Sequence, residues 1–323
     1  MMDRKAEDHS PFTILLLGKN GQVGWELHRT LSPLGEVIAT DRQTLDITDF
    51  HRVRETIHTI RPRIIVNATA YTAVDRAEDE PDLAMLINGT APGVLAEEAK
   101  KCGALFVHYS TDYVFDGTKK GSYTEEDTPN PLNVYGRTKL AGEEAIQSVD
   151  GNYLIFRTSW VYGERGHNFY LTIRRLAKEK EEISVVDDQI GAPTWCRTIA
   201  ENTAFILAQG VNREEGYSAY YEKRKGLYHM TAAGQTSWYE FAKRIVETVP
   251  PEERKLKRVL PIKTKDYGYK AQRPLNSVMS LKKTELFWKP VTNHWSSLFD
   301  LCNVLMFEKN DTLENDGKKK AGS

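Results

Sequence analysis

An apolar run followed by evenly spaced glycines constrains the fold of this chain most. Residues 12–17 read Phe-Thr-Ile-Leu-Leu-Leu, which is typical of a strand buried on both faces of a parallel sheet. Gly18, Gly21 and Gly24 follow at a spacing of three, before a helical pattern that runs to Leu31. Glycines between a strand and a helix permit a tight turn and close approach of a pyrophosphate to backbone N–H groups. This context favours a dinucleotide site over a simple turn.

Strand-like and helical patterns then alternate through the first half of the chain. The expected strands are 36–39, 64–67, 104–110 and 153–163, and the expected helices are 48–60 with Thr48 as its cap, 81–101 and 137–145. Strands that alternate with helices of this length predict βαβ units. The fold class that follows is α/β, with a Rossmann-type doubly wound parallel sheet that binds ligands at the carboxyl ends of its strands.

The pattern loosens after residue 163. Helical patterns cover 168–180, 198–208, 237–249 and 294–307, strand-like ones 183–186 and 227–230, a loop 187–194, and charged connections 210–225 and 250–257. We expect a polar leader at 1–11, an NAD(P)-binding domain at 12–165 to which 195–230 returns, and a disordered tail at 308–323. Residues 166–194 and 231–307 would form a smaller, partly interleaved C-terminal α/β domain for the substrate.

The stretch from Ser110 to Lys139 holds a hydroxyl, a phenol and an ammonium group. Tyr135 and Lys139 lie in a segment of helix-forming composition, so they are expected one turn apart on one helix face. Ser110 and Thr111 end the strand at 104–110, on the same sheet edge as the glycine loop. This arrangement predicts reduction of a carbonyl group. The alternative is an ordinary pair of Tyr and Lys on a helix surface.

The end of the second expected strand bears on the choice of cofactor. Asp41 lies about twenty residues beyond the glycines, where an acidic side chain can bond the ribose 2′-OH of NAD. Arg42 can instead receive the 2′-phosphate of NADP, so the sequence leaves NADH or NADPH open. The small residues of 68–72 follow the third strand, where a cofactor could approach the backbone. The alternative is that these alanines simply pack.

Composition and charge exclude several classes of protein. The chain has 44 basic and 45 acidic residues, so its net charge of −1 gives no reason to expect nucleic acid or an anionic membrane as partner. No secretory signal or apolar run of membrane-spanning length is present, and a cytoplasmic location is expected. Cys102, Cys196 and Cys302 lack a CxxC spacing, so we expect reduced thiols rather than disulfides or a zinc site.

The motifs together resemble the extended short-chain dehydrogenase/reductase superfamily. Within it, the chain is similar to the dTDP-4-dehydrorhamnose reductase family from about residue 13 to about residue 307. The resemblance rests on segments that occur in one order, namely 17–19, 21–27, 108–115, 131–142, 156–162, 188–194 and 273–277. It implies transfer of a hydride from NADPH or NADH to the C4 keto carbon of dTDP-6-deoxy-L-lyxo-4-hexulose, a small nucleotide-sugar substrate.

The resemblance also assigns roles to residues. Tyr135 would protonate the developing alkoxide, Thr111 would hold the carbonyl oxygen, and Lys139 would favour the phenolate as a nearby cation. Asp112 and Trp160 would contact the substrate, and the alternative for Trp160 is a core tryptophan at a strand end. The implied cofactor contacts are Gly18, Gly21, Gln22, Val23, Gly24, Asp41, Arg42, Asp46, Ile47, Ala70, Tyr71, Thr72, Tyr109, Tyr135 and Lys139.

The chain differs at two places from related sequences, and these differences bear on its reaction and on metal binding. Relatives that dehydrate sugar nucleotides carry an Asp-Glu pair after the threonine, whereas here Tyr113 follows Asp112, which favours plain reduction. Some family members bind Mg²⁺ between subunits. Glu26 matches one ligand, but Arg197 stands where another would align, and a fixed cation disfavours a metal. Mg²⁺ therefore rests on Glu26 alone, which could be only a solvated helix residue, and both a monomer and a homodimer remain open.

Two other functions remain as alternatives at this stage. The same fold could serve as a non-catalytic regulatory subunit, as in the similar β subunit of methionine adenosyltransferase. It could also reduce the 4-keto group of another NDP-sugar. The intact Thr111, Tyr135 and Lys139 favour an enzyme.

Overall fold

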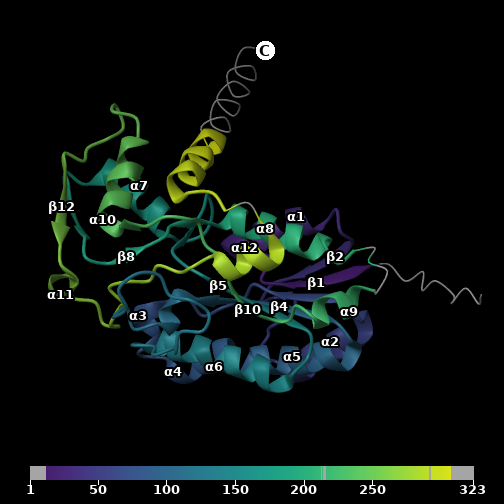
Figure 1. Cartoon of the computed structure of the whole chain (residues 1–323). Coiled ribbons are helices and arrows are strands. Elements are labelled where there is room, and N and C mark those ends of the chain that lie inside the picture. The colour runs from purple at the N-terminus through teal and green to yellow at the C-terminus, as the bar shows by residue number, and fades with distance from the viewer. Residues whose placement is uncertain (1–11, 212, 214–215, 291, 307–323) are drawn as a thin grey trace, which may run out of the picture.

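A six-stranded parallel sheet forms the centre of the computed structural model, which describes residues 12–211, 213, 216–290 and 292–306 (Figure 1). In spatial order its strands are β10 (Gly226–His229), β5 (Tyr153–Thr158), β4 (Leu105–Thr111), β3 (Ile64–Asn67), β1 (Thr13–Leu17) and β2 (Glu36–Thr40). All neighbours pair in parallel. The chain passes from β1 outward to β2 and returns to β3 on the other side of β1, so the strand order reverses between β1 and β3. The expected Rossmann-type sheet is confirmed. The predicted leader and tail lie outside the described residues.

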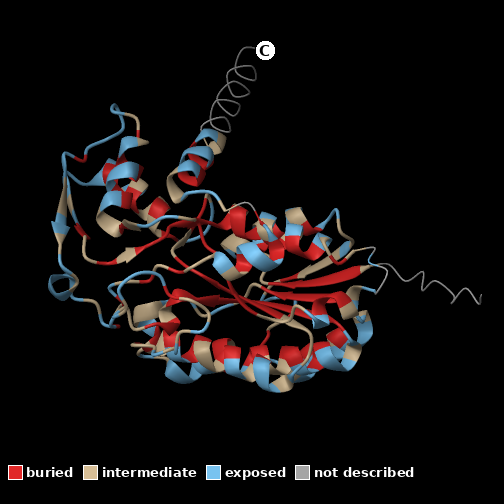
Figure 2. Cartoon of the chain, in the orientation of Figure 1, coloured by how far each residue is buried: buried red, intermediate tan, exposed pale blue. Residues whose placement is uncertain are grey.

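Helices cover both faces of this sheet (Figure 2). One face packs against α1 (Gln22–Leu31), α8 (Cys196–Ala208), α9 (Tyr217–Glu222) and α12 (Lys282–Trp288), and the other against α2 (Phe50–Ile60), α5 (Ala91–Cys102) and α6 (Val134–Val149). The alternation within β1 explains this arrangement. Ile14 and Leu16 belong to the first core while Leu15 and Leu17 belong to the second, because successive strand side chains point to opposite faces. An all-apolar strand therefore needs helices on both sides.

A second group of elements has its own apolar core and lies beside the carboxyl ends of the strands. It contains β6 (Val161–Tyr162), α7 (Phe169–Glu179), β7 (Glu182–Val186), β8 (Ile190–Gly191), β9 (Thr194–Trp195), β11 (Thr236–Ser237), α10 (Trp238–Glu247), β12 (Arg258–Ile262), α11 (Thr264–Tyr267) and a helix at 295–306. The rings of Tyr162, Tyr170, Phe241 and Phe299 form the centre of this core. β7 and β12 pair in parallel at its outer side.

The expected cap of the second helix is wrong. Thr48 does not cap α2, because its backbone N–H and its hydroxyl both bind the Asp46 carboxylate, at 2.9 and 2.7 Å. Asp49 is the cap instead, and its side chain accepts the backbone N–H of Arg52 at 3.1 Å. A carboxylate at this position also faces the positive end of the helix dipole.

The expected continuous helix at 81–101 is interrupted. α4 (Pro81–Met85) passes into a π-helical turn, η1 (Leu86–Thr90), before α5 begins. The extra residue of this turn brings Asn88 beside the backbone of Tyr71, from which it accepts an N–H at 2.8 Å and to which it donates at 3.0 Å. The π turn therefore fixes the loop that follows β3, together with the short α3 (Val74–Ala77).

The expected strand at 153–163 ends early. β5 stops at Thr158, and Trp160 adopts a left-handed backbone with φ +47°. This residue turns the chain out of the main sheet, so Val161 and Tyr162 pair with Thr194 and Trp195 instead. Two segments that were expected to be irregular connections also contain regular secondary structure. Residues 187–194 include β8 and part of β9, and residues 210–225 include α9.

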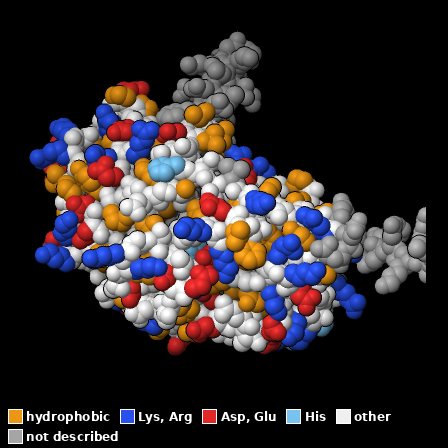
Figure 3. Space-filling view, viewed as in Figure 1, with side chains coloured by type: hydrophobic (Ala, Val, Ile, Leu, Met, Phe, Trp, Pro, Cys, Tyr) orange, Lys and Arg blue, Asp and Glu red, His pale blue; other side chains and the backbone are white. Residues whose placement is uncertain are grey.

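The surface carries mixed charge. Figure 3 shows basic and acidic side chains interspersed over the visible face, in line with the near-zero net charge. Across the described ranges, no helix is long and apolar enough to cross a membrane.

A buried ion pair ties the sheet to α6. Glu143 on α6 accepts two hydrogen bonds from Arg157 on β5, at 2.9 and 2.6 Å, and a third from the Ser110 hydroxyl at the end of β4. The side chains of Arg157 and Glu143 are 3% and 2% exposed. Because a buried charge without its partner is strongly unfavourable, this pair fixes α6 against β4 and β5.

Glu143→Gln should therefore destabilise the protein. The change leaves the Arg157 guanidinium buried without its carboxylate, and we expect the free energy of unfolding to fall by about 3 kcal/mol. Urea denaturation measures this loss. Arg175→Gln is the control, because its ion pair with Glu179 is about half exposed and should contribute less than about 1 kcal/mol. Equal losses in the two variants would contradict the assigned role of the buried pair.

Candidate active site

The glycine loop packs against the end of β3. Gly18 has φ +88°, and a Cβ on it would lie 3.0 Å from the carbonyl group of Ala68. A Cβ on Gly24 would lie 2.0 Å from the Gly18 carbonyl oxygen, so only glycine permits α1 to start this close to β1. Gly21 caps α1 without a side-chain hydrogen bond. The loop therefore presents the positive N-terminus of α1 at the sheet edge, as an anion site requires.

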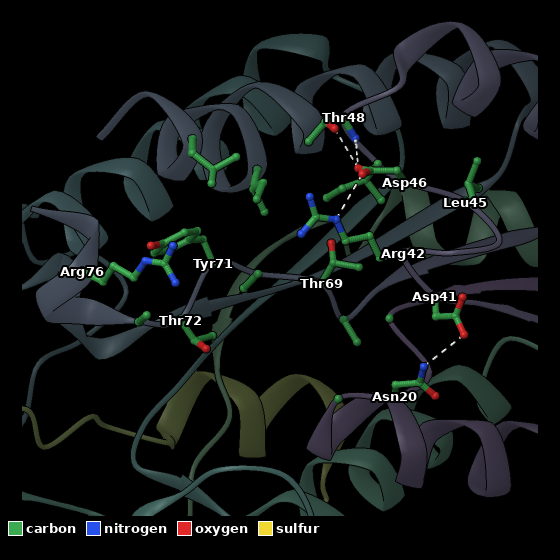
Figure 4. Close-up of a pocket in the computed structure, with 18 residues that line it drawn as sticks. Asn20, Asp41, Arg42, Leu45, Asp46, Thr48, Thr69, Tyr71, Thr72 and Arg76 are labelled. Atoms are coloured by element: carbon green, nitrogen blue, oxygen red, sulfur yellow. Dashed lines mark hydrogen bonds and ion pairs between the residues drawn. The ribbon is translucent and has the colours of Figure 1, made fainter. Parts of the chain in front are cut away.

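A cavity of about 500 Å³ opens at this edge, where the carboxyl ends of β1, β2 and β3 meet (Figure 4). Its location is the point at which the strand order reverses, where doubly wound sheets bind ligands. Nine of the expected cofactor contacts line it, namely Gly18, Gly21, Asp41, Arg42, Asp46, Ile47, Ala70, Tyr71 and Thr72.

Acidic and basic side chains lie together at one end of the cavity. Asp41 accepts hydrogen bonds from the backbone and hydroxyl of Thr44 and from Asn20, and the Thr44 bonds lower the pKa of its carboxyl to about 2. Arg42 points away from the Asp41 carboxylate and donates to Asp46 at 3.3 Å, as Figure 4 shows. An ionised acceptor and an exposed guanidinium thus both line this part of the cavity, which can bind a hydroxyl or a phosphate.

The other expected cofactor contacts lie outside this cavity's lining. Gln22 accepts a hydrogen bond from Asn168 at 2.8 Å, and Val23 packs between two apolar cores. The Tyr109 hydroxyl is buried at 2.8 Å from Thr203 on α8, so its ring faces away from α6. Gly24 lies in α1, and Tyr135 and Lys139 lie in α6.

Several lining residues are absent from the sequence-based set, namely Asn20, Leu45, Thr48, Ala68, Thr69, Ala73, Arg76, Leu83 and Ile87. Asn20 lies within the glycine loop, and Ala68 and Thr69 lie within the small-residue stretch after β3, so both motifs pointed to them. Arg76 and Ile87 come from α3 and the π turn, which no periodic pattern in the sequence reveals.

Tyr135 lies in the first turn of α6. The Asn133 side chain caps this helix by accepting the Gly136 N–H at 2.8 Å, so the expected helix is confirmed but begins three residues before the expected start at residue 137. The Tyr135 ring is half-buried and meets the Tyr113 ring edge to face, with centroids 5.6 Å apart. Burial raises the pKa of Tyr135 to about 12, and a hydrogen bond with Thr111 offsets part of this rise. The phenol is therefore protonated at neutral pH and can donate a proton.

Lys139 lies one turn further along α6 and is buried. Its Nζ donates to the Tyr109 carbonyl at 2.6 Å and lies 3.0 Å from Nε2 of His108, so both partners are on β4. Burial lowers the pKa of Lys139 to about 8. Lys139 therefore contacts the β4 backbone directly. This contact lies next to the end of β4, where Tyr135 meets Thr111.

Asp112 follows Thr111 in a short 3-10 turn, η2 (Asp112–Val114), and is 3% exposed. One carboxylate oxygen accepts the Thr111 hydroxyl at 3.1 Å, while the other, Oδ2, makes no hydrogen bond of normal geometry among the described residues. Burial raises the pKa of the Asp112 carboxyl to about 6, although the Ser277 hydroxyl lies close enough to lower this pKa in part. A buried carboxylate oxygen that lacks a donor can accept a hydroxyl group from a ligand.

Trp160 lies where β5 gives way to the second group of elements. Its indole stacks on Trp238 with centroids 3.6 Å apart and an angle of 8° between the rings. Gly191 packs against the same indole, where a Cβ would approach its Cε2 atom to 2.4 Å. The strained backbone of Trp160 and its half-buried ring agree with a functional position, since such strain is common at ligand sites.

Glu26 does not fit a magnesium site. Its carboxylate is 3.1 Å from Arg29 and 3.8 Å from Arg197, and both arginines also contact Glu201. Two guanidinium groups already neutralise this carboxylate, which disfavours a divalent cation there. Within the described part of the chain, no group of three or more His, Cys, Asp or Glu side chains is arranged to hold a metal.

Comparison with known proteins gives the family. The chain matches the sequence model described as RmlD substrate binding domain over residues 12–303. It is 49% identical over 271 residues to the dTDP-4-dehydrorhamnose reductase of Burkholderia thailandensis, which is 83% of this chain and 90% of the relative. It is 46% identical over 292 residues to the protein of the same name from Escherichia coli K12, which is 87% of this chain and 94% of the relative.

The similarity extends to solved structures. A dTDP-4-dehydrorhamnose reductase from Bacillus anthracis str. Ames, in complex with NADP, matches with a TM-score of 0.82 at 35% identity, covering 91% of this chain and 99% of that one. These matches span the sheet, the glycine loop and the stretch that holds Tyr135. The chain therefore belongs to the dTDP-4-dehydrorhamnose reductase family of the extended short-chain dehydrogenases/reductases.

Proposed function

We propose that this enzyme reduces the C4 keto group of dTDP-6-deoxy-L-lyxo-4-hexulose to give dTDP-L-rhamnose, with NADPH or NADH as reductant. The observation that carries the proposal is the meeting of Thr111 and the protonated phenol of Tyr135 at the sheet edge that also holds the cavity. The names of relatives up to 49% identical support the choice of substrate. The NADP complex of the Bacillus anthracis relative supports the cofactor.

The cavity suits a dinucleotide. The glycine loop and the N-terminus of α1 would receive the pyrophosphate, and Asp41 or Arg42 would receive the ribose or its 2′-phosphate. The loop 70–72 would lie against the same cofactor. A bound reduced nicotinamide supplies the hydride. Gly18, Gly21 and Gly24 have no side chain, so the loop backbone could approach the pyrophosphate closely.

Tyr135 would donate its proton to the C4 oxygen as negative charge develops there. Its pKa of about 12 keeps the proton on the phenol until an alkoxide, a stronger base, forms beside it. Thr111 is held by the Tyr113 N–H, which donates to its hydroxyl oxygen at 3.1 Å. The Thr111 proton, directed at Asp112 here, would turn to the carbonyl oxygen of the substrate.

Asp112 and Trp160 would bind the sugar. The unpartnered oxygen of Asp112 suits a sugar hydroxyl, and the part of the Trp160 indole that stays exposed beside Trp238 suits the apolar edge of a 6-deoxy ring. The nucleotide-sugar would then lie between the main sheet and the elements of 166–194 and 231–307, which we propose as the substrate domain. Asp75 on α3 and Arg273 would close one side of this substrate site, because they form a bidentate ion pair at 3.0 and 2.8 Å.

Tyr135→Phe should lower kcat by about 10²- to 10⁴-fold, because it removes the general acid and leaves the ring in place. The affinity for NADPH should change little. Turnover is followed by NADPH absorbance with enzymatically prepared dTDP-4-keto-6-deoxy sugar. Tyr153→Phe is the control, since Tyr153 begins β5 at the opposite edge of the sheet. Unchanged turnover of Tyr135→Phe would refute the role of Tyr135.

The wild-type protein tests the function itself in the same assay. Substrate-dependent oxidation of NADPH or NADH is expected with the dTDP sugar. No oxidation with either cofactor would refute the reductase proposal and leave the regulatory-subunit alternative. Oxidation with a UDP or GDP 4-keto sugar but not with the dTDP sugar would show that the substrate is another NDP-sugar.

Arg42→Ala should separate the two cofactors. If the guanidinium receives the 2′-phosphate, its loss removes a charge-assisted hydrogen bond of about 1.5–3 kcal/mol and raises KM for NADPH tenfold or more. KM for NADH should change less than about twofold. Steady-state kinetics with both cofactors measure the difference, and Arg52→Ala, an exposed change on α2 outside the cavity lining, is the control. Equal changes for NADPH and NADH would refute this role of Arg42.

A further inference from the structure

A chain of buried polar groups connects the loop after β3 to Lys139. Thr69 donates its backbone N–H to Oδ1 of Asn67 at 3.0 Å, and Nδ2 of Asn67 lies 3.2 Å from Nδ1 of His108. Nε2 of His108 lies 3.0 Å from Nζ of Lys139. Asn67, His108 and Lys139 are each at most 1% exposed, so these contacts are made without competing solvent.

The direction of the first hydrogen bonds is fixed by the backbone. The Thr69 N–H can only donate, so the Asn67 atom that faces it must be the oxygen. The Asn67 amide nitrogen then faces His108 and donates to Nδ1, which must be unprotonated. Burial is the larger cause that lowers the pKa of His108, and a charge on Lys139 would lower it further, so in either case the ring is neutral; with Nδ1 as acceptor, its one proton is on Nε2.

This tautomer of His108 determines the protonation state of Lys139. The Nε2–H of His108 points at Nζ of Lys139, so Nζ must accept a hydrogen bond. An ammonium group has three donors and no acceptor, whereas a neutral amine has a lone pair. The amine still has N–H groups, one of which donates to the Tyr109 carbonyl at 2.6 Å.

The opposite direction leaves two donors facing each other. An ammonium on Lys139 would require the His108 proton on Nδ1, where it meets the Asn67 amide hydrogens. Turning the Asn67 amide over removes that clash but places its NH₂ group against the Thr69 N–H. The first arrangement buries a donor without an acceptor, and the second leaves the half-buried Thr69 N–H without its acceptor, so both are disfavoured.

The charges around Lys139 agree with this direction. Glu143, on the next turn of α6, favours the ammonium, but Arg157 on β5 binds both of its oxygens. Tyr135 on the preceding turn is a neutral phenol. Burial is the largest influence and lowers the pKa of Lys139 to about 8, and donation from His108 lowers this pKa further because it stabilises only the neutral amine.

We propose that Asn67 and His108 are positioning residues that hold Lys139 as a neutral amine in the cofactor-free enzyme, through the Nε2–H tautomer of His108. Its consequence for catalysis rests on the proposed function: before the cofactor binds, Lys139 acts through hydrogen bonds and does not draw a proton from Tyr135 by its charge. The phenol thus remains ready to donate.

Nitrogen-15 NMR of the histidine-labelled, cofactor-free protein at pH 7.5 tests the proposal. The Nδ1 and Nε2 shifts distinguish the two neutral tautomers and the protonated ring, and the spectrum of His108→Gln identifies the His108 signals. We expect Nε2–H for His108. His229 is an internal control, because its Nδ1 lies 3.2 Å from the Ser280 carbonyl and must carry the proton there.

Asn67→Asp provides a matched change of nearly the same shape. A carboxylate accepts from Thr69 and from His108 alike, so the His108 proton should move to Nδ1 and Lys139 should become an ammonium. The tautomer of His229 should not change in this variant. Nδ1–H or a doubly protonated ring on His108 in the wild-type protein would overturn the proposal, even if Asn67→Asp does not fold. The measurement uses no substrate, so its failure is distinct from failure of the proposed function.

Discussion

The contact of Gly24 with the Gly18 carbonyl sets the geometry on which the site depends. A methyl group at residue 24 would approach that oxygen to 2.0 Å, so glycine alone lets α1 begin directly over the end of β1. Because the strand order reverses between β1 and β3, no crossover helix among the described residues covers the edge at this point. The cavity and the N-terminus of α1 therefore share one opening.

A second close approach sets the other half of the site. A Cβ on Gly136 would lie 2.2 Å from the Tyr113 carbonyl oxygen, so α6 begins directly against the turn that follows β4. This contact brings Tyr135 to Thr111, and the Glu143–Arg157 pair holds the rest of the helix against the sheet. Two glycines in the first turns of α1 and α6 thus bring the phenol and the cavity to the same sheet edge, as the proposed reaction requires.

Much of this could be predicted from local pattern. β1 to β4, most of the helices and the pair of Tyr135 and Lys139 follow from hydrophobic period, the glycine spacing and residue types. The missed features depend on distant contacts. Asn67 meets His108 across 41 residues, and Asp75 meets Arg273 across 198, so neither pair leaves a local signal. The π turn arises because Asn88 must reach the backbone of Tyr71, which helix propensity does not report.

Transfer of deuterium tests the central claim most directly. The claim is that a hydride reaches C4 of the sugar while Tyr135 supplies the proton to its oxygen. The measurement incubates the protein and the dTDP-4-keto-6-deoxy sugar with NADPH deuterated at the transferring position of the nicotinamide, and examines the isolated product by NMR and mass spectrometry. The account predicts one deuterium, at C4 of the rhamnose ring. A rhamnose product without deuterium at C4, or with deuterium at another carbon, would contradict it.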